Sequence, residues 1–342
     1  MGAVIVVDAF WGDSGKGKIA AHLARRLGVT YSARAGTGTN AGHSVYMENG
    51  KLLKLNQLPA ALVQKDSQVR VGSGVAVDPE IFLRELDEYE SDFDLRRRTK
   101  VDYRCPIITP EFRKAEAEDD GLAHKIGSTQ SGTGFALSQF ILRKAQQAKD
   151  MRELEGFTTD VAAEMNEACD QGETVLIESS QGTWLSLALS PDYPYCTSDN
   201  CTAAASADDV GLNWKHIQEV VMLVKAVPSR VGEGPLPFEI SKEEIQDRGI
   251  AEYGVTTGRP RRKASQISWP HLRYSVMLNG PTQIALTFCD HLDPDVVGIR
   301  DQSKLTKKVM SLVERIEDEC GVPVTLVETG KTLDCIVELD CR

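Results

Sequence analysis

A glycine-rich turn near the N-terminus constrains the fold of this chain more than any other feature. Residues 3–8 (AVIVVD) are almost continuously apolar, which predicts a buried strand, and residues 12–18 (GDSGKGK) follow three residues later. A helix is expected from about Lys18 to Leu27, because apolar residues recur there at helical spacing. A strand, a GxxxxGK turn and a helix in this order predict a phosphate-binding loop, whose backbone N–H groups face the anion. A glycine-rich turn without a ligand is the alternative.

Further apolar runs predict a mostly parallel central sheet that helices cover on both faces. The expected strands are 174–178, 220–227, 283–290 and 322–327. Helical patterns at 151–170 and 304–320 alternate with them. Buried strands that alternate with helices are typical of the α/β class. Because no internal repeat or linker interrupts the pattern, residues 1–342 are expected to form a single large domain.

Charge and composition exclude several classes of protein. The formal net charge is −11, which disfavours a nucleic-acid partner. No apolar run approaches the roughly 20 residues that span a bilayer, and the N-terminus lacks the basic start of a signal peptide. The eight cysteines include no CxxC pair, which disfavours a zinc site or a disulfide framework. We therefore expect no membrane contact and a cytoplasmic protein, in the host cytoplasm if the chain is viral.

The phosphate-loop pattern lacks one of its usual groups. Ile19 follows Lys18, at the position where such loops carry the hydroxyl that binds magnesium. Another group must therefore hold the metal, and Asp13 within the loop is the candidate. The residues of this loop expected to bind nucleotide phosphates are Gly12, Ser14, Gly15, Lys16, Gly17 and Lys18.

Five loops in sequence order resemble those of the adenylosuccinate synthetase family. They are WGDSGKGK (11–18), GTNAGHS (38–44), KIGSTQSGTG (125–134), ESSQGTWL (178–185) and TTGRPRRK (256–263). The similarity covers essentially the whole chain, including RVGEGP (230–235) and ETGK (328–331). It implies an α/β enzyme that joins aspartate to inosine monophosphate (IMP) with GTP and Mg²⁺. In that reaction the γ-phosphate is transferred to the purine O6, and the aspartate amine then displaces it.

The resemblance also implies catalytic roles. Asp13 resembles the general base that removes the N1 proton, and it also resembles a magnesium ligand. His43 resembles the acid and electrostatic stabiliser at the transferring phosphoryl group. Gln181 would hold the purine six-position, and the carbonyl of Gly42 resembles a second magnesium ligand. The five histidines other than His43 are expected to be structural or on the surface.

Binding residues follow from the same resemblance. The residues implied to bind the purine monophosphate are Asp13, Ser14, Asn40, Ser128, Thr129, Arg143, Gln181, Thr197 and Val231. Those implied at the nucleotide phosphates, beyond the loop, are Arg261, Asp290, Thr329 and Gly330. Those implied to bind aspartate are Val255, Thr256, Thr257 and Arg259. Because Arg143 would reach the monophosphate from a neighbouring subunit, the resemblance implies a homodimer.

Two departures from the family pattern bear on the substrates. Ser14 replaces the family's glutamate, which leaves a hydroxyl able to bond an exocyclic 2-amino group. Phe288 replaces the lysine of T-K-x-D, the motif that recognises guanine, so ATP becomes a reasonable donor. With the short chain, these changes resemble the bacteriophage branch, which joins aspartate to dGMP with ATP. The product there is N6-succino-2-amino-2'-deoxyadenylate, a precursor of 2-aminoadenine DNA.

Two alternatives to the dGMP ligase stay open. An ordinary adenylosuccinate synthetase would use IMP and GTP in the same site. A P-loop GTPase or regulatory nucleotide-binding module would need a hydroxyl after Lys18 and a complete guanine-recognition motif, and the chain has neither in full.

Overall fold

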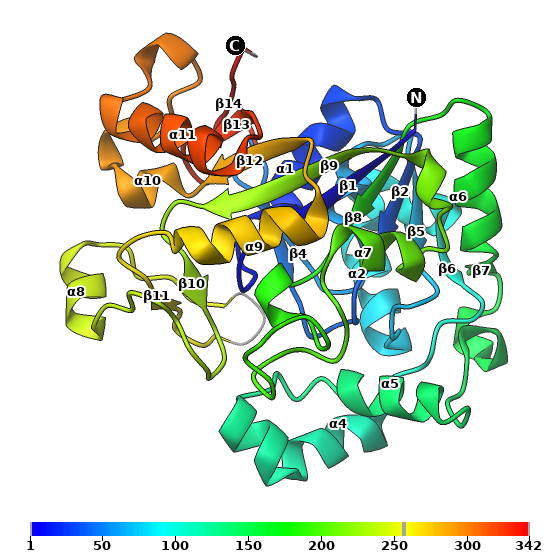
Figure 1. The fold of residues 1–342 in the computed structure, drawn as a ribbon. Coiled ribbons are helices and arrows are strands. Elements are labelled where there is room, and N and C mark those ends of the chain that lie inside the picture. The colour runs from blue at the N-terminus through cyan, green and yellow to red at the C-terminus, as the bar shows by residue number, and fades with distance from the viewer. Residues whose placement is uncertain (1, 255–257, 341–342) are drawn as a thin grey trace.

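A computed structural model describes residues 2–254 and 258–340. Within them, one ten-stranded sheet runs through the molecule (Figure 1). Its strands, in spatial order, are β14 (Ile336–Glu338), β13 (Val324–Glu328), β12 (Gln283–Thr287), β9 (Ile217–Lys225), β1 (Ala3–Asp8), β8 (Val175–Glu178), β2 (Tyr31–Arg34), β5 (Gln68–Val71), β6 (Thr99–Asp102) and β7 (Thr158–Thr159). Neighbouring strands are parallel except β13 and β14.

Two short antiparallel pairs lie outside this sheet. They are β3 (His43–Tyr46) with β4 (Leu52–Leu55), and β10 (Ser229–Arg230) with β11 (Arg262–Lys263). The α-helices are α1 (Lys16–Arg26), α2 (Pro79–Phe93), α3 (Leu95–Arg98), α4 (Pro110–Glu118), α5 (Thr133–Ile141), α6 (Val161–Asp170), α7 (Ala203–Asp209), α8 (Lys242–Asp247), α9 (Trp269–Asn279), α10 (Cys289–Leu292) and α11 (Lys307–Cys320). One-turn helices occupy 60–63, 148–150, 152–154, 183–185, 214–216, 294–296 and 302–304, and a π-helical turn occupies 121–126.

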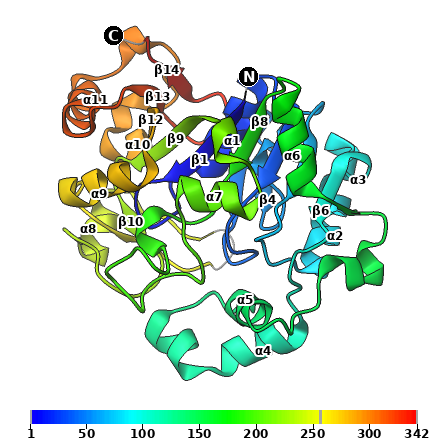
Figure 2. The same cartoon turned by 45° about the vertical axis from the view of Figure 1, so that its right-hand side comes forward.

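Alternate residues of β1 pack on opposite faces of the sheet. Ile5 and Val7 belong to a core shared with α6, α7, α9 and α11, which lie together over one face (Figure 2). Val4 and Val6 pack with α1 on the other face. Every residue of β1 is buried, as expected of a strand covered on both sides. These contacts confirm the α/β class and the mostly parallel, helix-covered sheet.

Element boundaries depart from the sequence predictions in several places; β9, for example, begins at Ile217, three residues before the predicted start. Helix α1 begins at Lys16, two residues earlier than expected. The predicted helix 151–170 is wrong in its first half: the chain turns at Gly156 (φ 81°) and forms β7 before α6 begins. The Asp160 side chain then caps α6 by accepting from the N–H of Ala163 (3.0 Å). The predicted strand 283–290 ends at Thr287, because Phe288 adopts φ 55° and α10 follows.

The loops that follow the parallel strands meet at one edge of the sheet. The phosphate loop follows β1, residues 35–42 follow β2, and residues 179–182 follow β8. Since the carboxyl ends of parallel strands share an edge, these segments come together although they are distant in sequence. Helices α4 and α5 lie below the sheet on this side (Figure 1). Among the described residues, no helix has the length and apolarity needed to cross a membrane.

Candidate active site

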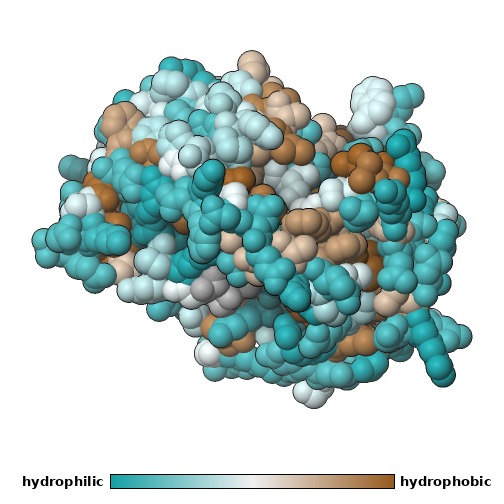
Figure 3. Space-filling view, turned by 90° about the horizontal axis from the view of Figure 1, so that it is seen from below, coloured by the Kyte–Doolittle hydropathy of each residue, from teal (hydrophilic) through white to brown (hydrophobic). Residues whose placement is uncertain are grey.

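A cavity of about 960 Å³ occupies the carboxyl edge of the sheet. The phosphate loop, residues 40–44, the 126–129 segment and the ends of β12 and β13 all contribute to its wall. Apolar side chains such as Leu122, Phe135 and Leu187 line part of it. On the face seen from below, apolar side chains gather near the centre among polar ones (Figure 3). The cavity therefore offers both apolar surface for a base and polar groups for phosphates.

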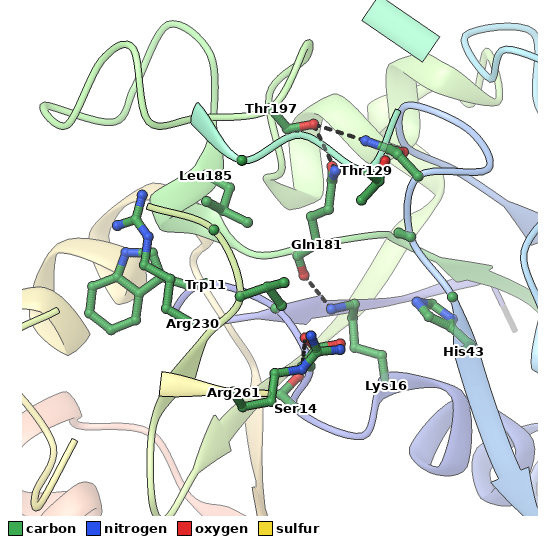
Figure 4. A pocket seen from close by; sticks show the side chains of 18 of the residues that line it. Trp11, Ser14, Lys16, His43, Thr129, Gln181, Leu185, Thr197, Arg230 and Arg261 are labelled. Carbon is green, nitrogen blue, oxygen red and sulfur yellow. Dashed lines mark hydrogen bonds and ion pairs between the residues drawn. The ribbon is translucent and has the colours of Figure 1, made fainter. Parts of the chain in front are cut away.

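The cavity brings most of the predicted site residues together. Those that line it are Gly12, Asp13, Ser14, Gly15, Lys16, Gly17, Lys18, Asn40, Gly42, His43, Ser128, Thr129, Gln181, Thr197, Val231, Arg261, Asp290 and Gly330. Figure 4 shows some of them, Ser14, Lys16, His43, Thr129, Gln181, Thr197 and Arg261, converging from separate elements. Residues as far apart in sequence as Gly12 and Gly330 thus line the same cavity, which their order in the sequence alone does not require.

Other predicted residues do not line it. Arg143 is exposed beyond the end of α5. Thr329 is fully buried and donates its hydroxyl to the Ile299 carbonyl (2.6 Å), which is a structural role. Arg259 donates to the carbonyls of Gly127 (2.6 Å) and Ser128 (2.9 Å) and so ties two loops together. The remaining aspartate-site predictions, Val255, Thr256 and Thr257, lie outside the described residues.

The two lysines of the phosphate loop have different surroundings. Lys16 Nζ bonds the Gln181 carbonyl and lies 3.4 Å from the Asp8 carboxylate, with Gln181 on the cavity wall. Lys18 Nζ instead donates to Glu328 (3.1 Å) and to backbone carbonyls that follow β13. Lys18 therefore braces the wall of the site, and Lys16 is the better candidate for a phosphate contact.

Strand pairing places two charged residues against His43. Arg34 and Glu178 end the neighbouring strands β2 and β8 and stand opposite each other in the register. Glu178 bonds His43 Nδ1, and Arg34 Nη1 lies 2.6 Å from the same atom. Burial, followed by the positive charge of Arg34, lowers the pKa of His43 to about 4. His43 is therefore neutral at pH 7 in the ligand-free protein.

A chain of hydrogen bonds connects the residues predicted to hold the purine monophosphate. Gln181 Nε2 donates to Thr197 Oγ1 (2.7 Å), and Asn40 Nδ2 donates to the same oxygen (3.3 Å) (Figure 4). Thr37 in turn donates to Asn40 Oδ1 (2.6 Å). Gln181 has φ 58°, so its backbone is held in a conformation that is uncommon outside glycine. Two loops thus present their amides jointly to the cavity.

Ser14 combines burial with an unused hydrogen-bonding group. Its side chain is 1% exposed, and it lines the cavity within the phosphate loop. Its Oγ has no hydrogen-bond partner among the described residues. Leaving a buried hydroxyl unpaired costs about 1–3 kcal/mol. A ligand with a polar group at this point would remove that cost.

Asp13 is held from two sides. Arg261 Nε lies 2.8 Å from its carboxylate, and Lys225 Nζ donates to its carbonyl (2.7 Å). Lys225 also pairs with Glu252 (2.8 Å). Burial alone would raise the pKa of Glu252, but the charges and hydrogen bonds of Lys225 and Lys263 lower it to about 2. The carboxylate of Glu252 thus stays charged and keeps both lysines in place.

The oxygen donors near Asp13 suit magnesium. Asp13 and Gly42 line the same cavity, next to the phosphate loop. Mg²⁺ is usually held by one or two carboxylates together with substrate phosphates and water, not by a full set of protein ligands. The described residues contain no group of three His, Cys, Asp or Glu side chains placed to hold a metal. Asp13 and the Gly42 carbonyl are therefore the candidate protein ligands for a nucleotide-bound Mg²⁺.

The sequence predictions missed several residues of the site. Arg34, Glu178, Lys225 and Glu252 were not singled out, although the first three are charged residues at the ends of β2, β8 and β9, which is the available signal for them. His291 was expected to be structural or on the surface, but it lines the cavity beside Asp290. These residues are far from the phosphate loop in sequence, and only their packing brings them to it.

Comparisons with known proteins agree with this arrangement. Residues 5–162 and 147–295 match the family model described as adenylosuccinate synthetase. Adenylosuccinate synthetase from Pyrococcus sp. (strain ST700) is 45% identical over 338 residues, which cover 99% of this chain and 98% of the relative. The enzyme of the same name from Archaeoglobus fulgidus is 43% identical over 339 residues, covering 99% and 98%.

Two solved structures share the fold. Fully ligated adenylosuccinate synthetase from Plasmodium falciparum superposes with a TM-score of 0.90 at 20% identity, covering 99% of this chain and 100% of that one. The cyanophage S-2L succinoaminodeoxyadenylate synthetase, bound to dGMP and dATP, gives a TM-score of 0.82 at 24% identity, covering 99% and 96%. From the family model and the full-length relatives, the chain belongs to the adenylosuccinate synthetase family.

Proposed function

We propose that this protein is a ligase that joins L-aspartate to C6 of dGMP with ATP. The γ-phosphoryl group of ATP is transferred to O6 of the purine, and the aspartate amine displaces phosphate at C6. The products are N6-succino-2-amino-2'-deoxyadenylate, ADP and phosphate. The observation that carries the choice of dGMP is the buried, unpartnered hydroxyl of Ser14.

The chemistry at C6 is the same for dGMP and IMP, because both carry N1–H and O6. In the proposal, Asp13 removes the N1 proton and O6 becomes nucleophilic. Gln181 bonds the purine six-position, and His43 stabilises charge at the transferring phosphoryl group. Asp13 and the Gly42 carbonyl would hold Mg²⁺, which would supply neutralisation of phosphate charge. The aspartate would be bound by Val255, Thr256, Thr257 and Arg259.

The 2-position of the purine separates the two acceptors. The exocyclic 2-amino group of dGMP is a hydrogen-bond donor, and IMP has only a hydrogen there. Ser14 Oγ can accept from that amino group, which would satisfy a hydroxyl that otherwise stays unpaired. When IMP is bound, the buried hydroxyl of Ser14 has no partner, and this cost disfavours IMP relative to dGMP. The Ser14 environment therefore favours dGMP.

The donor end of the cavity supports ATP. An aromatic ring, Phe288, stands at the end of β12 where a guanine-recognising lysine is common in the family. Its ring lies 4.0 Å from Lys225 Nζ and also contributes to the cavity wall. A ring offers stacking to any base and gives no hydrogen bond to the guanine O6.

An ordinary adenylosuccinate synthetase, using IMP and GTP, is the second candidate. The full-length relatives at 43–45% identity carry that name, so the comparisons favour this candidate over the first. A GTPase or regulatory module is a third reading, and it would release phosphate without aspartate. Membership in a ligase family argues against that reading.

One experiment separates these readings. The purified protein is incubated with Mg²⁺, aspartate and either ATP or GTP, and dGMP or IMP is offered in parallel. Product is followed by ultraviolet absorbance and mass. Product from dGMP with ATP supports the proposal, and product from IMP alone establishes the second candidate. Phosphate release that ignores aspartate would point to the third.

A further inference from the structure

His291 has a chemical environment that the catalytic roles above do not use. It lies in α10 directly after Asp290, and both residues line the cavity. Its Nδ1 is 3.2 Å from Lys263 Nζ, and its ring packs against Phe288 with centroids 5.2 Å apart at 63°. The ring is therefore held from two sides, by a cation and by an aromatic edge contact.

Lys263 determines which nitrogen of His291 carries the proton. Lys263 is fully buried and donates to Glu252 Oε2 (2.7 Å). Burial, followed by the charge of Lys225, lowers its pKa to about 8, so it is still an ammonium at neutral pH. An ammonium group can donate hydrogen bonds but cannot accept one, so Nδ1 of His291 must be the acceptor of the Lys263 hydrogen bond. The hydrogen of the neutral ring is therefore on Nε2. Burial and the Lys263 charge also lower the pKa of His291, which keeps the ring neutral.

The wall that contains His291 adjoins the phosphate loop. A Cβ placed on Gly15 would lie 3.5 Å from Phe288 Cε2. Lys225 bridges the two regions, since its ammonium bonds the Asp13 carbonyl and lies 4.0 Å from the Phe288 ring. A nucleotide with its phosphates on the loop therefore has Phe288, Asp290 and His291 within reach of its base.

We propose that His291 is a specificity-determining residue for the donor nucleotide, with Nε2–H donating to an acceptor nitrogen of the purine while Asp290 accepts from its exocyclic amino group. The choice of an adenine nucleotide rests on the function proposed above. Adenine carries its 6-amino donor beside an acceptor on both edges, N1 on one and N7 on the other. A fixed donor next to a fixed carboxylate matches that pattern.

The test measures binding of ADP, 7-deaza-ADP and 1-deaza-ADP by calorimetry, with Mg²⁺ and without acceptor or aspartate. In the wild type, removing the nitrogen that His291 contacts weakens binding roughly three- to ten-fold, as expected for one hydrogen bond. The His291→Leu variant should bind ADP more weakly than the wild type by a similar factor. The variant should also bind ADP and the deaza analogue that lacks the contacted nitrogen with equal affinity. Such coupling identifies a direct contact, which a purely structural histidine would not give.

Control variants separate the contact from general damage. His216→Leu, at an exposed ion pair with Asp170, should leave ADP affinity unchanged. His291→Asn restores an N–H donor and should bind ADP more tightly than His291→Leu. Lys263→Met, which removes the group that orders the tautomer, should weaken ADP binding and reduce the deaza coupling. Thermal melting checks that each variant is folded.

Two results would overturn the inference. One is a folded His291→Leu that binds ADP as the wild type does. The other is a loss of affinity that is equal for ADP and both deaza analogues, since the histidine then acts through structure alone. A failure of the proposed function is seen separately, on the wild type, as tighter binding of GDP than ADP or as turnover of IMP and not dGMP. In a protein that prefers GDP, the effect of His291→Leu on GDP affinity decides the inference.

Discussion

Arg261 Nε lies 2.8 Å from the carboxylate of Asp13, inside the loop that precedes α1. The Arg261 side chain is 7% exposed and that of Asp13 is 28% exposed, so the arginine is shielded from water and the carboxylate stays open to the cavity. Its Nε and Nη1 make no well-aligned hydrogen bond among the described residues, which leaves the guanidinium able to bond an additional anion. One side chain can therefore hold Asp13 and face the transferring phosphate.

Asp13→Asn should abolish ligation while leaving ADP binding in the absence of Mg²⁺ largely intact, because Asp13 is also a proposed Mg²⁺ ligand. The amide keeps the shape of the side chain but cannot take the N1 proton, and general-base catalysis contributes about 10²–10⁴-fold. Turnover and ADP affinity are measured side by side. An Asp13→Asn protein with more than a tenth of wild-type turnover would remove Asp13 from the role of base.

Ser14→Glu should reverse or erase the preference for dGMP over IMP. A carboxylate fills the space of the 2-amino group, and the selectivity, expressed as the ratio of kcat/KM values, should fall at least about ten-fold. Ser14→Ala is the matched control: it removes the hydroxyl without adding bulk, so it should lower the same ratio less. An unchanged ratio in Ser14→Glu would contradict the role proposed for Ser14.

His43 should stay neutral over the physiological pH range in the free protein. Its pKa is lowered to about 4 from an unfolded value near 6.5, so protonation between those values favours the unfolded chain. The contribution of His43 to stability is therefore present above pH 6.5 and is lost as pH falls toward 4. Nuclear magnetic resonance of its ring should show no titration from pH 8 to 5.5, and a midpoint near 6.5 would refute this.

Glu252→Gln should destabilise the protein and disturb the phosphate loop. The change leaves Lys225 and Lys263 as buried cations without a counter-charge, and breaking such a pair costs about 3–5 kcal/mol at full burial. Because Glu252 is 18% exposed, a smaller loss is expected. Chemical denaturation measures it, and Glu239→Gln, which breaks an exposed pair with Arg262, is the control.

Arg143 should act in trans if the protein is a homodimer. Its side chain is exposed and does not line the cavity of its own chain. Arg143→Leu and Asp13→Asn should each be inactive alone and regain about a quarter of wild-type activity when mixed and re-associated. Half of the dimers would then be mixed, each with one intact site. A mixture that stays inactive, in a preparation shown to exchange subunits, would place Arg143 elsewhere.

The sequence by itself determined the α/β class and the strand, glycine-rich turn and helix at the N-terminus, and its resemblance to the family pointed to 18 of the residues that line the cavity. The N-terminal elements depend on local order, since a buried strand, closely spaced glycines and a lysine within a few residues predict a phosphate loop. The one large error in the elements, the helix expected at 151–170, arose because apolar residues there also suit a one-turn helix and a short strand before α6.

Only the tertiary structure decided the partners of those residues. Glu178 stands 135 positions from His43, and it reaches the ring because the register of β2 and β8 aligns it with Arg34. Lys263, at the end of β11, lies 3.2 Å from His291 in α10, 28 positions further along the chain. The register of parallel strands is set by how the two faces of the sheet pack against the helices. The local sequence around a charged residue at a strand end therefore does not indicate which residue it will pair with. The protonation states and the tautomer at this site are therefore properties of the packed fold.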